Sequence, residues 1–483
     1  MKNSSNPAMY ETMIPNRKTS EISTIAILLA VIPGSFLSHF SAGLVNIALT
    51  DITNDFQISL SLSQWIVTAY LLSVMIFLPI MGKLSDQFGR KTIHNSGYIF
   101  FGIGVLFSFL SHSIIYLLLS RILQGIGAAM LQSVNMVIIT ENVPTEKRVK
   151  ALGLIGTSVG IGGLLGAPVG GILINWFSWN TLFLIQLPFV LCALIVAIHF
   201  IPSDPRGTKI RFDFIGASLF AFSITLIVFV LSQIGEGIFH LKQVVIVGIG
   251  LLSLFTFIRW IKRYHSPFIE LSIFKHPIVK IGSCIIIGSY AACFATIVVL
   301  PFYLRGVLEY STTASGLLLM IYPLFLSFFG PISGAISARI GSYKVVQIAL
   351  LFMIAAFTFF AFLNMDSPMW TIIVILAVLG ISMGLLTSPN YDLIMENIPA
   401  AFLGSIGGTI ALLRNLGMVV GTALGISIVN FSAIVPVTKW LTLDNIEEQI
   451  SILNGFTNVF ILFICILVVL FIQLKIVGRK IPS

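Results

Sequence analysis

Long apolar runs dominate this sequence and restrict what it can fold into. About fourteen runs, each 19 to 28 residues long, recur between residues 23 and 477 with short polar segments between them. A helix that crosses the hydrocarbon core of a membrane needs about 20 apolar residues. Only 9% of the residues are charged, whereas soluble domains carry about 25%. Because the runs lack the alternation of a membrane β-barrel, we predict an all-α polytopic membrane protein.

The loops between the runs carry a charge asymmetry that predicts topology. The spans are expected at about 23–45, 62–81, 94–112, 114–138, 150–174, 179–201, 213–233, 242–262, 278–303, 312–336, 344–364, 369–389, 403–430 and 452–477. With a cytoplasmic N-terminus, 22 of the 27 Lys and Arg residues lie on the cytoplasmic side. Positive charge favours that side. We therefore expect a multi-pass protein of the cell inner (cytoplasmic) membrane with both termini in the cytoplasm.

The rest of the composition argues against several classes. The net charge of +9 lies in loops, where it is expected to contact anionic membrane lipid rather than nucleic acid. The four cysteines lie inside apolar runs, without metal-ligand or disulfide spacing. The sequence has no G-x-x-x-x-G-K-[ST] phosphate loop and no H-E-x-x-H pair. We expect no cofactor, no metal and no enzymatic activity.

Two internal repeats indicate a duplicated unit. The segment 82–89, GKLSDQFG, recurs 252 positions later as GAISARIG at 334–341, and ENVP at 141–144 recurs 255 positions later as ENIP. Secondary transporters are built from such repeats and bind substrate between them. The predicted organisation is a cytoplasmic arm at 1–22, a six-helix half at 23–201, an inserted two-helix linker at 202–277 and a second six-helix half with a short tail at 278–483.

The first repeated loop has the composition of a gate. Glycines let helix ends approach closely, and Asp86 can pair with a helix N-terminus or with an arginine across the interface between the halves. The sequence GKLSDQFGRK resembles the signature between the second and third helices of the major facilitator superfamily, which implies a major facilitator fold. An ordinary basic loop is the alternative. The predicted gating residues are Gly82, Asp86, Gly89, Arg90, Lys91, Gly334, Arg339 and Gly341. Ala338 replaces the carboxylate in the second copy.

The fourth predicted span carries an arginine and a polar stripe. An arginine inside a span costs about 2.5–3.5 kcal/mol by insertion scales, so its side chain should face protein or water. Arg121, Gln124, Gln132 and Asn135 share one helix face. This favours a water-filled cavity, and polar contacts that join helices are the alternative. The sequence around Arg121 is similar to the second signature of the same superfamily, R-x-x-Q-G.

The fifth predicted span is rich in glycine and ends in GAPVGG. Glycines at a spacing of three or four permit close helix packing. The run resembles the G-P-x-x-G-G signature of drug:proton antiporters, but Ala167 stands at the proline of that signature and Pro168 follows one place later. The departure weakens the implied assignment to export. The predicted packing residues are Gly160, Gly166, Pro168, Gly170 and Gly171.

Two further stretches resemble the 14-helix drug:proton antiporter family of multidrug, quaternary ammonium and tetracycline exporters. Residues 178–188 are similar to its W-x-x-x-F-x-I-N-x-P element, and Arg414 to Gly417 match its R-x-x-G element. In the first span, Asn46 fits the L-D-x-T-x-x-N-x-A-L-P signature of the family. Ser41, however, occupies the acidic position, and none of the 18 Asp and Glu residues falls in the middle of a predicted span.

Because no carboxylate falls in the middle of a predicted span, three interpretations of proton coupling remain. His39 could carry the proton, because an imidazole titrates near neutral pH with an unperturbed pKa of about 6.5. Alternatively the substrate is neutral or anionic and lies near Arg121 or Arg414, with protons handled at Asp86, Asp392 or Glu396. Transport without coupling is the third reading.

We expect a monomeric secondary transporter whose partners are protons and a small-molecule substrate. It would export a small lipophilic or antibiotic-like compound by alternating access. An importer or exporter of a neutral or anionic metabolite or lipid, and a non-transporting sensor, are the alternatives. Arg121, Gln124 and Arg414 form the predicted proton or substrate relay. The predicted substrate cavity contains His39, Asn46, Gln132 and Asn135.

Overall fold

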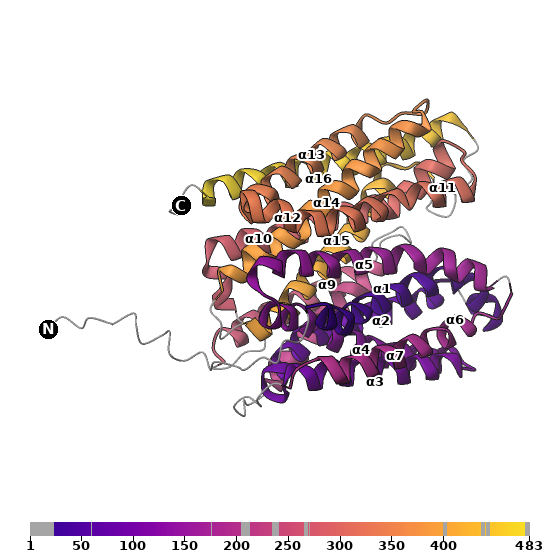
Figure 1. The fold of residues 1–483 in the computed structure, drawn as a ribbon. Helices are drawn as coiled ribbons and strands as arrows, with labels where there is room; N and C mark the ends of the chain where they lie inside the picture. Colours follow the sequence, from indigo (N-terminus) through magenta and orange to yellow (C-terminus); the bar gives the residue numbers. More distant parts are fainter. Residues whose placement is uncertain are drawn as a thin grey trace.

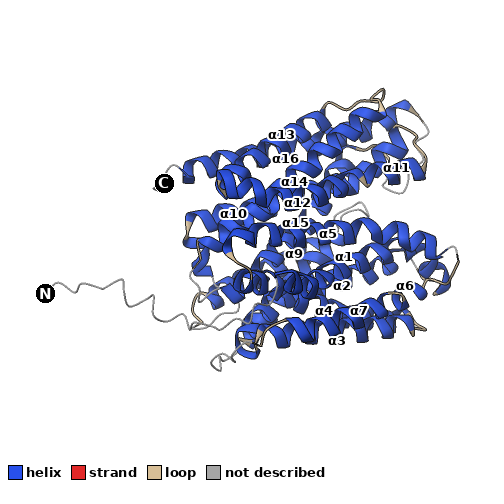
Figure 2. Cartoon of the chain, viewed as in Figure 1, coloured by secondary structure: helices blue, strands red, loops and turns tan. Residues whose placement is uncertain are grey.

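The described part of the chain is helical. The computed structural model describes residues 24–58, 60–174, 176–203, 213–233, 241–264, 269, 271–398, 403–435, 440 and 445–478, and these ranges contain no strand (Figure 2). The predicted arm at 1–22 lies outside the described residues.

The helices form two halves of six predicted spans each, one span of each half being divided into two helices, and an inserted pair. The first half contains α1 Thr24–Asp55, α2 Leu60–Phe88, α3 Arg90–Phe109, α4 Ile114–Asn142, α5 Thr145–Ile174, α6 Thr181–Leu184 and α7 Gln186–Phe200. The pair is α8 Phe214–Gln233 and α9 Leu241–Ile261. The second half contains α10 Pro277–Phe302, α11 Thr312–Leu319, α12 Ile321–Ile340, α13 Ser342–Ala361, α14 Met369–Glu396, α15 Leu403–Ser432 and α16 Ile446–Gly478. Short non-α helices lie at η4 Leu271–Lys275 and η5 Tyr303–Val307.

The helices match the expected membrane architecture in length and composition. Within the described residues, ten helical segments are long and apolar enough to cross a membrane, and shorter apolar helices lie at Phe214–Val230 and Val245–Ile261. The other two predicted spans correspond to α3 and α5, so the count of fourteen stays a prediction. Two spans expected to be continuous are divided, because α6 gives way to α7 at Ile185 and α11 to α12 at Met320.

The backbone repeats the duplication seen in the sequence. Gly89 and Gly341, 252 positions apart, separate α2 from α3 and α12 from α13 with φ angles of 88° and 84°. Gln57 and Glu309, also 252 positions apart, are the two described non-glycine residues with positive φ, at 52° and 56°. The two halves therefore keep the same unusual turns at the same places.

The halves lie side by side, as the indigo-to-magenta and orange-to-yellow regions of Figure 1 show. Helix α5 packs against α12 of the other half, and α2 packs against α15. Helices α8 and α9 pack mainly on each other, with smaller contacts from α8 to α2 and α15. The Ser223 hydroxyl donates to the Ser253 hydroxyl at 2.9 Å within this pair.

Glycines bring the backbones of the two halves together at two equivalent places. A Cβ added to Gly153 on α5 would lie 2.5 Å from the Gly330 carbonyl oxygen on α12. A Cβ added to Gly408 on α15 would lie 2.6 Å from the Leu78 carbonyl oxygen on α2. Gly153 and Gly408 are 255 positions apart. The contacts are thus equivalent in the two halves, and only glycine fits at either.

Both contacts lie toward the end of the bundle that carries the repeated loops, here called the latch end. Arg90 contacts Glu141 at the end of α4, and Gly334 packs on the Lys150 backbone at the start of α5. One short connection between α4 and α5 therefore touches both repeated loops, which places them at the same end of the molecule.

At the opposite end, the equivalent helices contact their own half. Gly166 on α5 approaches Gly43 on α1, and Gly421 on α15 approaches the Ala291 backbone on α10. A Cβ added to Gly163 would meet no atom within 4 Å. The glycine contacts between halves therefore lie toward the latch end.

Candidate functional site

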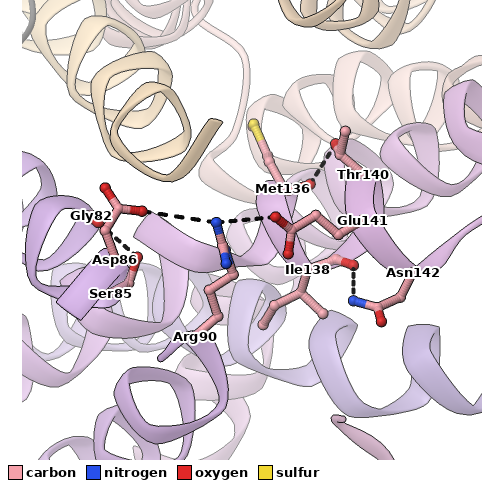
Figure 3. Close-up of polar contacts among 9 residues, drawn as sticks. All are labelled: Gly82, Ser85, Asp86, Arg90, Met136, Ile138, Thr140, Glu141 and Asn142. Carbon is pink, nitrogen blue, oxygen red and sulfur yellow. Dashed lines mark hydrogen bonds and ion pairs between the residues drawn. The ribbon is translucent and has the colours of Figure 1, made fainter. Parts of the chain in front are cut away.

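An arginine joins three helices of the first half at the latch end (Figure 3). The Arg90 guanidinium at the start of α3 lies 3.0 Å from the Glu141 carboxylate on α4 and 3.8 Å from the Asp86 carboxylate on α2. All three side chains are partly exposed to solvent. Asp86 therefore meets an arginine of its own half, whereas the sequence led us to expect a helix N-terminus or an arginine across the interface between the halves. The structure adds Glu141, which sequence reasoning recognised only as a marker of the repeat.

Local backbone geometry positions this ion-pair group. The positive φ of Gly89 turns the chain between the end of α2 and the start of α3, so that Arg90 faces back toward Asp86 across a single turn. The Ser85 hydroxyl donates to the Gly82 carbonyl oxygen at 2.6 Å and closes the last turn of α2 (Figure 3). The loop is therefore held in a defined shape.

The second repeated loop has different chemistry on the same backbone. Ala338 and Arg339 are exposed, and Ser342 stands where Arg90 stands in the first half. The Ser342 hydroxyl donates to Asp392 at 2.8 Å. Arg148, from the first half, lies close enough to act electrostatically on Asp392 and Glu396. The cation facing these carboxylates therefore comes from the other half.

Arg121 is completely buried inside the first half. Its Nε donates to the Ile66 carbonyl oxygen at 3.2 Å, and its Nη1 donates to the Ser41 hydroxyl at 3.2 Å and to Gln124 Oε1. The guanidinium also lies 4.3 Å from the centre of the Tyr70 ring. Ser41, the residue at the acidic position of the family signature, thus contacts Arg121 directly. No carboxylate of the described residues pairs with this arginine.

Arg414 lies between the halves, about midway along α15. Its Nη2 donates to Gln132 Oε1 on α4 at 2.5 Å. The Tyr391 hydroxyl on α14 lies against Arg414 and 3.1 Å from the Tyr290 hydroxyl on α10. The charge of Arg414 also reaches His39 on α1. We call these five residues, from five helices, the central polar cluster.

The remaining cavity candidates differ in their surroundings. Asn135 Nδ2 donates to the Ser35 hydroxyl at 2.8 Å, so Asn135 joins α4 to α1 inside the first half. His39 is half-buried, and its Nδ1 lies 2.9 Å from the Ser35 carbonyl oxygen. The side chain of Asn46 lies outside the described part of the chain. The structure therefore brings His39 and Gln132 to the central polar cluster. Asn135 is not part of that cluster and contacts Ser35 inside the first half.

The glycines of α5 pack against helices of both halves. A Cβ on Gly160 would lie 2.8 Å from Leu326 Cδ2 of the second half, and one on Gly166 would lie 2.7 Å from Gly43 Cα of the first half. Gly170 is buried and Gly171 is half-buried. The side chain of Pro168 is not among those described. The same helix thus packs between halves near the latch end and within its own half beyond it.

Sequence reasoning missed Tyr290, Tyr391 and Arg148, as well as the ion pair of Glu141. Tyr391 carried a usable signal, because it lies between Asn390 and Asp392 at the end of an otherwise apolar run. Tyr290 carried none, since a lone tyrosine in a span is ordinary. Among the described residues, no three His, Cys, Asp or Glu side chains group closely enough to hold a metal ion.

Comparisons with known proteins agree on one family. A family profile described as Major Facilitator Superfamily matches residues 31–422. The riboflavin transporter RibZ of Clostridioides difficile is 32% identical over 398 residues, which cover 82% of this chain and 86% of that protein. The lincomycin resistance protein LmrB of Listeria monocytogenes is 26% identical over 411 residues, which cover 85% and 87%.

A solved structure shares the fold. The proton:xylose symporter XylE superposes with a TM-score of 0.63 at 15% identity, covering 95% of this chain and 96% of that protein. An identity this low supports the fold and nothing about the substrate.

Proposed function

Because the chain belongs to the major facilitator superfamily, and is therefore a multi-pass membrane transporter of small molecules, we propose that it exports a small lipophilic or antibiotic-like compound by alternating access. In this mechanism the two halves rock about a site between them, which opens to each side of the membrane in turn. The halves are proposed to divide at 201 and 278, with the pair α8 and α9 outside the transport core.

The observation that carries this proposal is the uneven packing of the two ends. Gly153 and Gly408 bring backbones of opposite halves together toward the latch end, while Gly166 and Gly421 pack within their own halves beyond it. An arrangement closed at one end is one of the two states that alternating access requires. The charge asymmetry of the loops supports a cytoplasmic position for the latch end. The proposed state is therefore closed to the cytoplasm.

Proton coupling is part of the proposal. Export of a neutral solute against a 100-fold gradient needs about 2.7 kcal/mol. One charge moving across 100 mV supplies about 2.3 kcal/mol, and a pH difference adds to this. The central polar cluster contains no carboxylate, so the titrating group is proposed among His39, Asp86 and the pair Asp392 and Glu396.

Export is tested with a deletion strain and with vesicles. We expect the strain to become more susceptible to at least one compound of a panel that includes lincomycin, and to accumulate that compound. Inverted vesicles should take it up, and a pH-sensitive dye inside them should report proton movement. Accumulation by right-side-out vesicles instead would contradict export. No substrate-induced dye response, with efflux unchanged by an ionophore, would remove proton coupling alone.

Transport of a flavin is the second candidate, favoured by the 32% identity to a riboflavin transporter. Right-side-out and inverted vesicles incubated with external riboflavin distinguish it directly, because flavin fluorescence reports uptake. Riboflavin movement that disappears in the deletion strain, with no change in drug susceptibility, would favour this candidate over drug export.

A further inference from the structure

The central polar cluster is positively charged and lacks an acidic partner. Arg414 is 3% exposed, and no carboxylate of the described residues lies within ion-pair distance of it. Its Nη2 donates to a neutral amide oxygen, that of Gln132. A buried charge is normally paired with an opposite charge or coordinated. Among the described residues, Arg414 has no such anionic partner.

One donor of the cluster is left without a described partner. The Nε of Arg414 is buried and has no hydrogen-bond partner among the described residues. The hydroxyls of Tyr290 and Tyr391 contact each other beside Arg414, and His39 contributes a half-buried ring. Arginine and tyrosine donors grouped in this way recognise carboxylate, sulfonate or phosphate oxygens.

The second buried arginine does not change this balance. Arg121 lies inside the first half with Ser41 in contact, at the position where the family signature places an acid. None of the 18 Asp and Glu residues falls in the middle of a predicted span, and Asp86 and Asp392 lie at the latch end. The middle of the molecule is therefore cationic, and a cationic substrate would meet no counter-charge there.

We propose that the central polar cluster binds an organic anion, so that the transported compound is a lipophilic molecule carrying a carboxylate, sulfonate or phosphate group. The inference rests on the proposed transport function and names the substrate class of the same site. In the arrangement described, Arg414 is held by Gln132 of the other half. An anion would take over the free Nε and the tyrosine hydroxyls, and Arg414 would bind it from one half while His39 approaches it from the other.

A pair of dyes tests the charge preference. 6-Carboxyfluorescein and rhodamine 123 share one tricyclic ring system but are anionic and cationic at neutral pH. Fluorescence anisotropy is measured with the full chain in nanodiscs of zwitterionic lipid. We expect carboxyfluorescein to bind at least about tenfold more tightly than rhodamine 123. Equal or tighter binding of rhodamine 123, or no binding of carboxyfluorescein, overturns the inference.

Variants assign the preference to the cluster. Arg414→Gln should weaken carboxyfluorescein binding at least about tenfold, and Tyr391→Phe, which keeps the ring, should weaken it a few-fold. Arg259→Gln on α9, outside both halves and exposed, is the matched loss of one positive charge and should change nothing. If Arg259→Gln weakens binding as much as Arg414→Gln, the dye is bound elsewhere and the inference is wrong.

A competition experiment with chloride distinguishes binding of an organic anion from binding of a simple inorganic anion. Binding is measured in a buffer free of organic anions with about 10 mM chloride and again with about 150 mM chloride, the latter on the order of physiological ionic strength. Retained carboxyfluorescein binding supports the organic anion, whereas displacement by chloride assigns the cluster to an inorganic ion and overturns the proposal. The susceptibility and vesicle experiments use other compounds. Export found there without dye preference removes the anion inference alone, and absence of transport in all of them removes the proposed function.

Discussion

The two halves share a backbone but not its polar chemistry. Both turn at a glycine with φ near 85° between their second and third helices, and both present a glycine to the opposite half. In the first half, Arg90 is enclosed by two carboxylates of its own half. In the second, Asp392 and Glu396 face Arg148 of the other half. The first group can persist in every state, whereas the second depends on the halves being together.

The buried arginines repeat this contrast at the middle of the molecule. Arg121 donates to groups of its own half, including Ser41 and Gln124, while Arg414 reaches across to Gln132. Contacts within a half hold that half together. Contacts between halves change when the halves move, so they belong to the transport cycle.

The largest expected effect separates the two arginines. Arg121→Ala removes three hydrogen bonds and leaves a cavity, so it should lower the free energy of unfolding by about 2–4 kcal/mol. Arg414→Ala should change stability much less and reduce transport more. Thermal unfolding in detergent, paired with vesicle transport, measures both. Equal stability losses for the two variants would break the contrast.

The glycine turns should respond alike. Gly89 and Gly341 have φ angles of 88° and 84° with ψ near 145°, a conformation that is essentially restricted to glycine. Alanine at either position should therefore cost about 1–3 kcal/mol. Similar shifts in thermal midpoint for Gly89→Ala and Gly341→Ala would sharpen the equivalence of the halves. A large shift for one variant alone would argue against it.

The cross-half glycines should affect transport more than folding. The added Cβ of Gly153→Ala or Gly408→Ala would lie 2.5 or 2.6 Å from a backbone oxygen of the other half. The latch end then closes poorly, and transport should fall at least tenfold, equivalent to about 1.4 kcal/mol. Gly163→Ala on the same helix as Gly153 is the control and should transport normally, because its Cβ meets no atom within 4 Å.

The smallest effect distinguishes the two charged groups. Arg90→Gln should lower stability by about 1 kcal/mol at most, since its ion pairs are partly exposed. Arg148→Gln should leave stability unchanged and open the latch end. A cysteine at Ser327, which lies at the interface with Thr157, reports opening by maleimide labelling in a background without other cysteines. Faster labelling in Arg90→Gln than in Arg148→Gln would reverse the assignment.

Sequence reasoning predicted much of the fold because its signals are local. Apolar runs predicted the helices, and the offset of 252 positions predicted a duplication that recurs in the φ angles of Gly89 and Gly341. The divisions at Ile185 and Met320 were not predicted, because neither residue is a glycine or a proline that would mark a break.

The site was harder to predict because its contacts are distant in sequence. Arg90 and Glu141 are 51 residues apart, and Arg414 and Gln132 are 282 apart. The helix period placed Gln132 and Asn135 on one face of α4, but it could not show that one meets Arg414 and the other meets Ser35. Residues on one face can have different neighbours at different depths.

The glycine contacts between α5 and α12 and between α2 and α15 have a mechanical consequence. Where Gly153 meets Gly330 and Gly408 meets Leu78, two backbones touch with no side chain between them, so the halves can separate at these two points without a change of rotamer. A shift between two conformations requires only a difference in ligand affinity between them. A modest preference of the transported compound for one conformation would then be enough to shift the equilibrium between the two conformations.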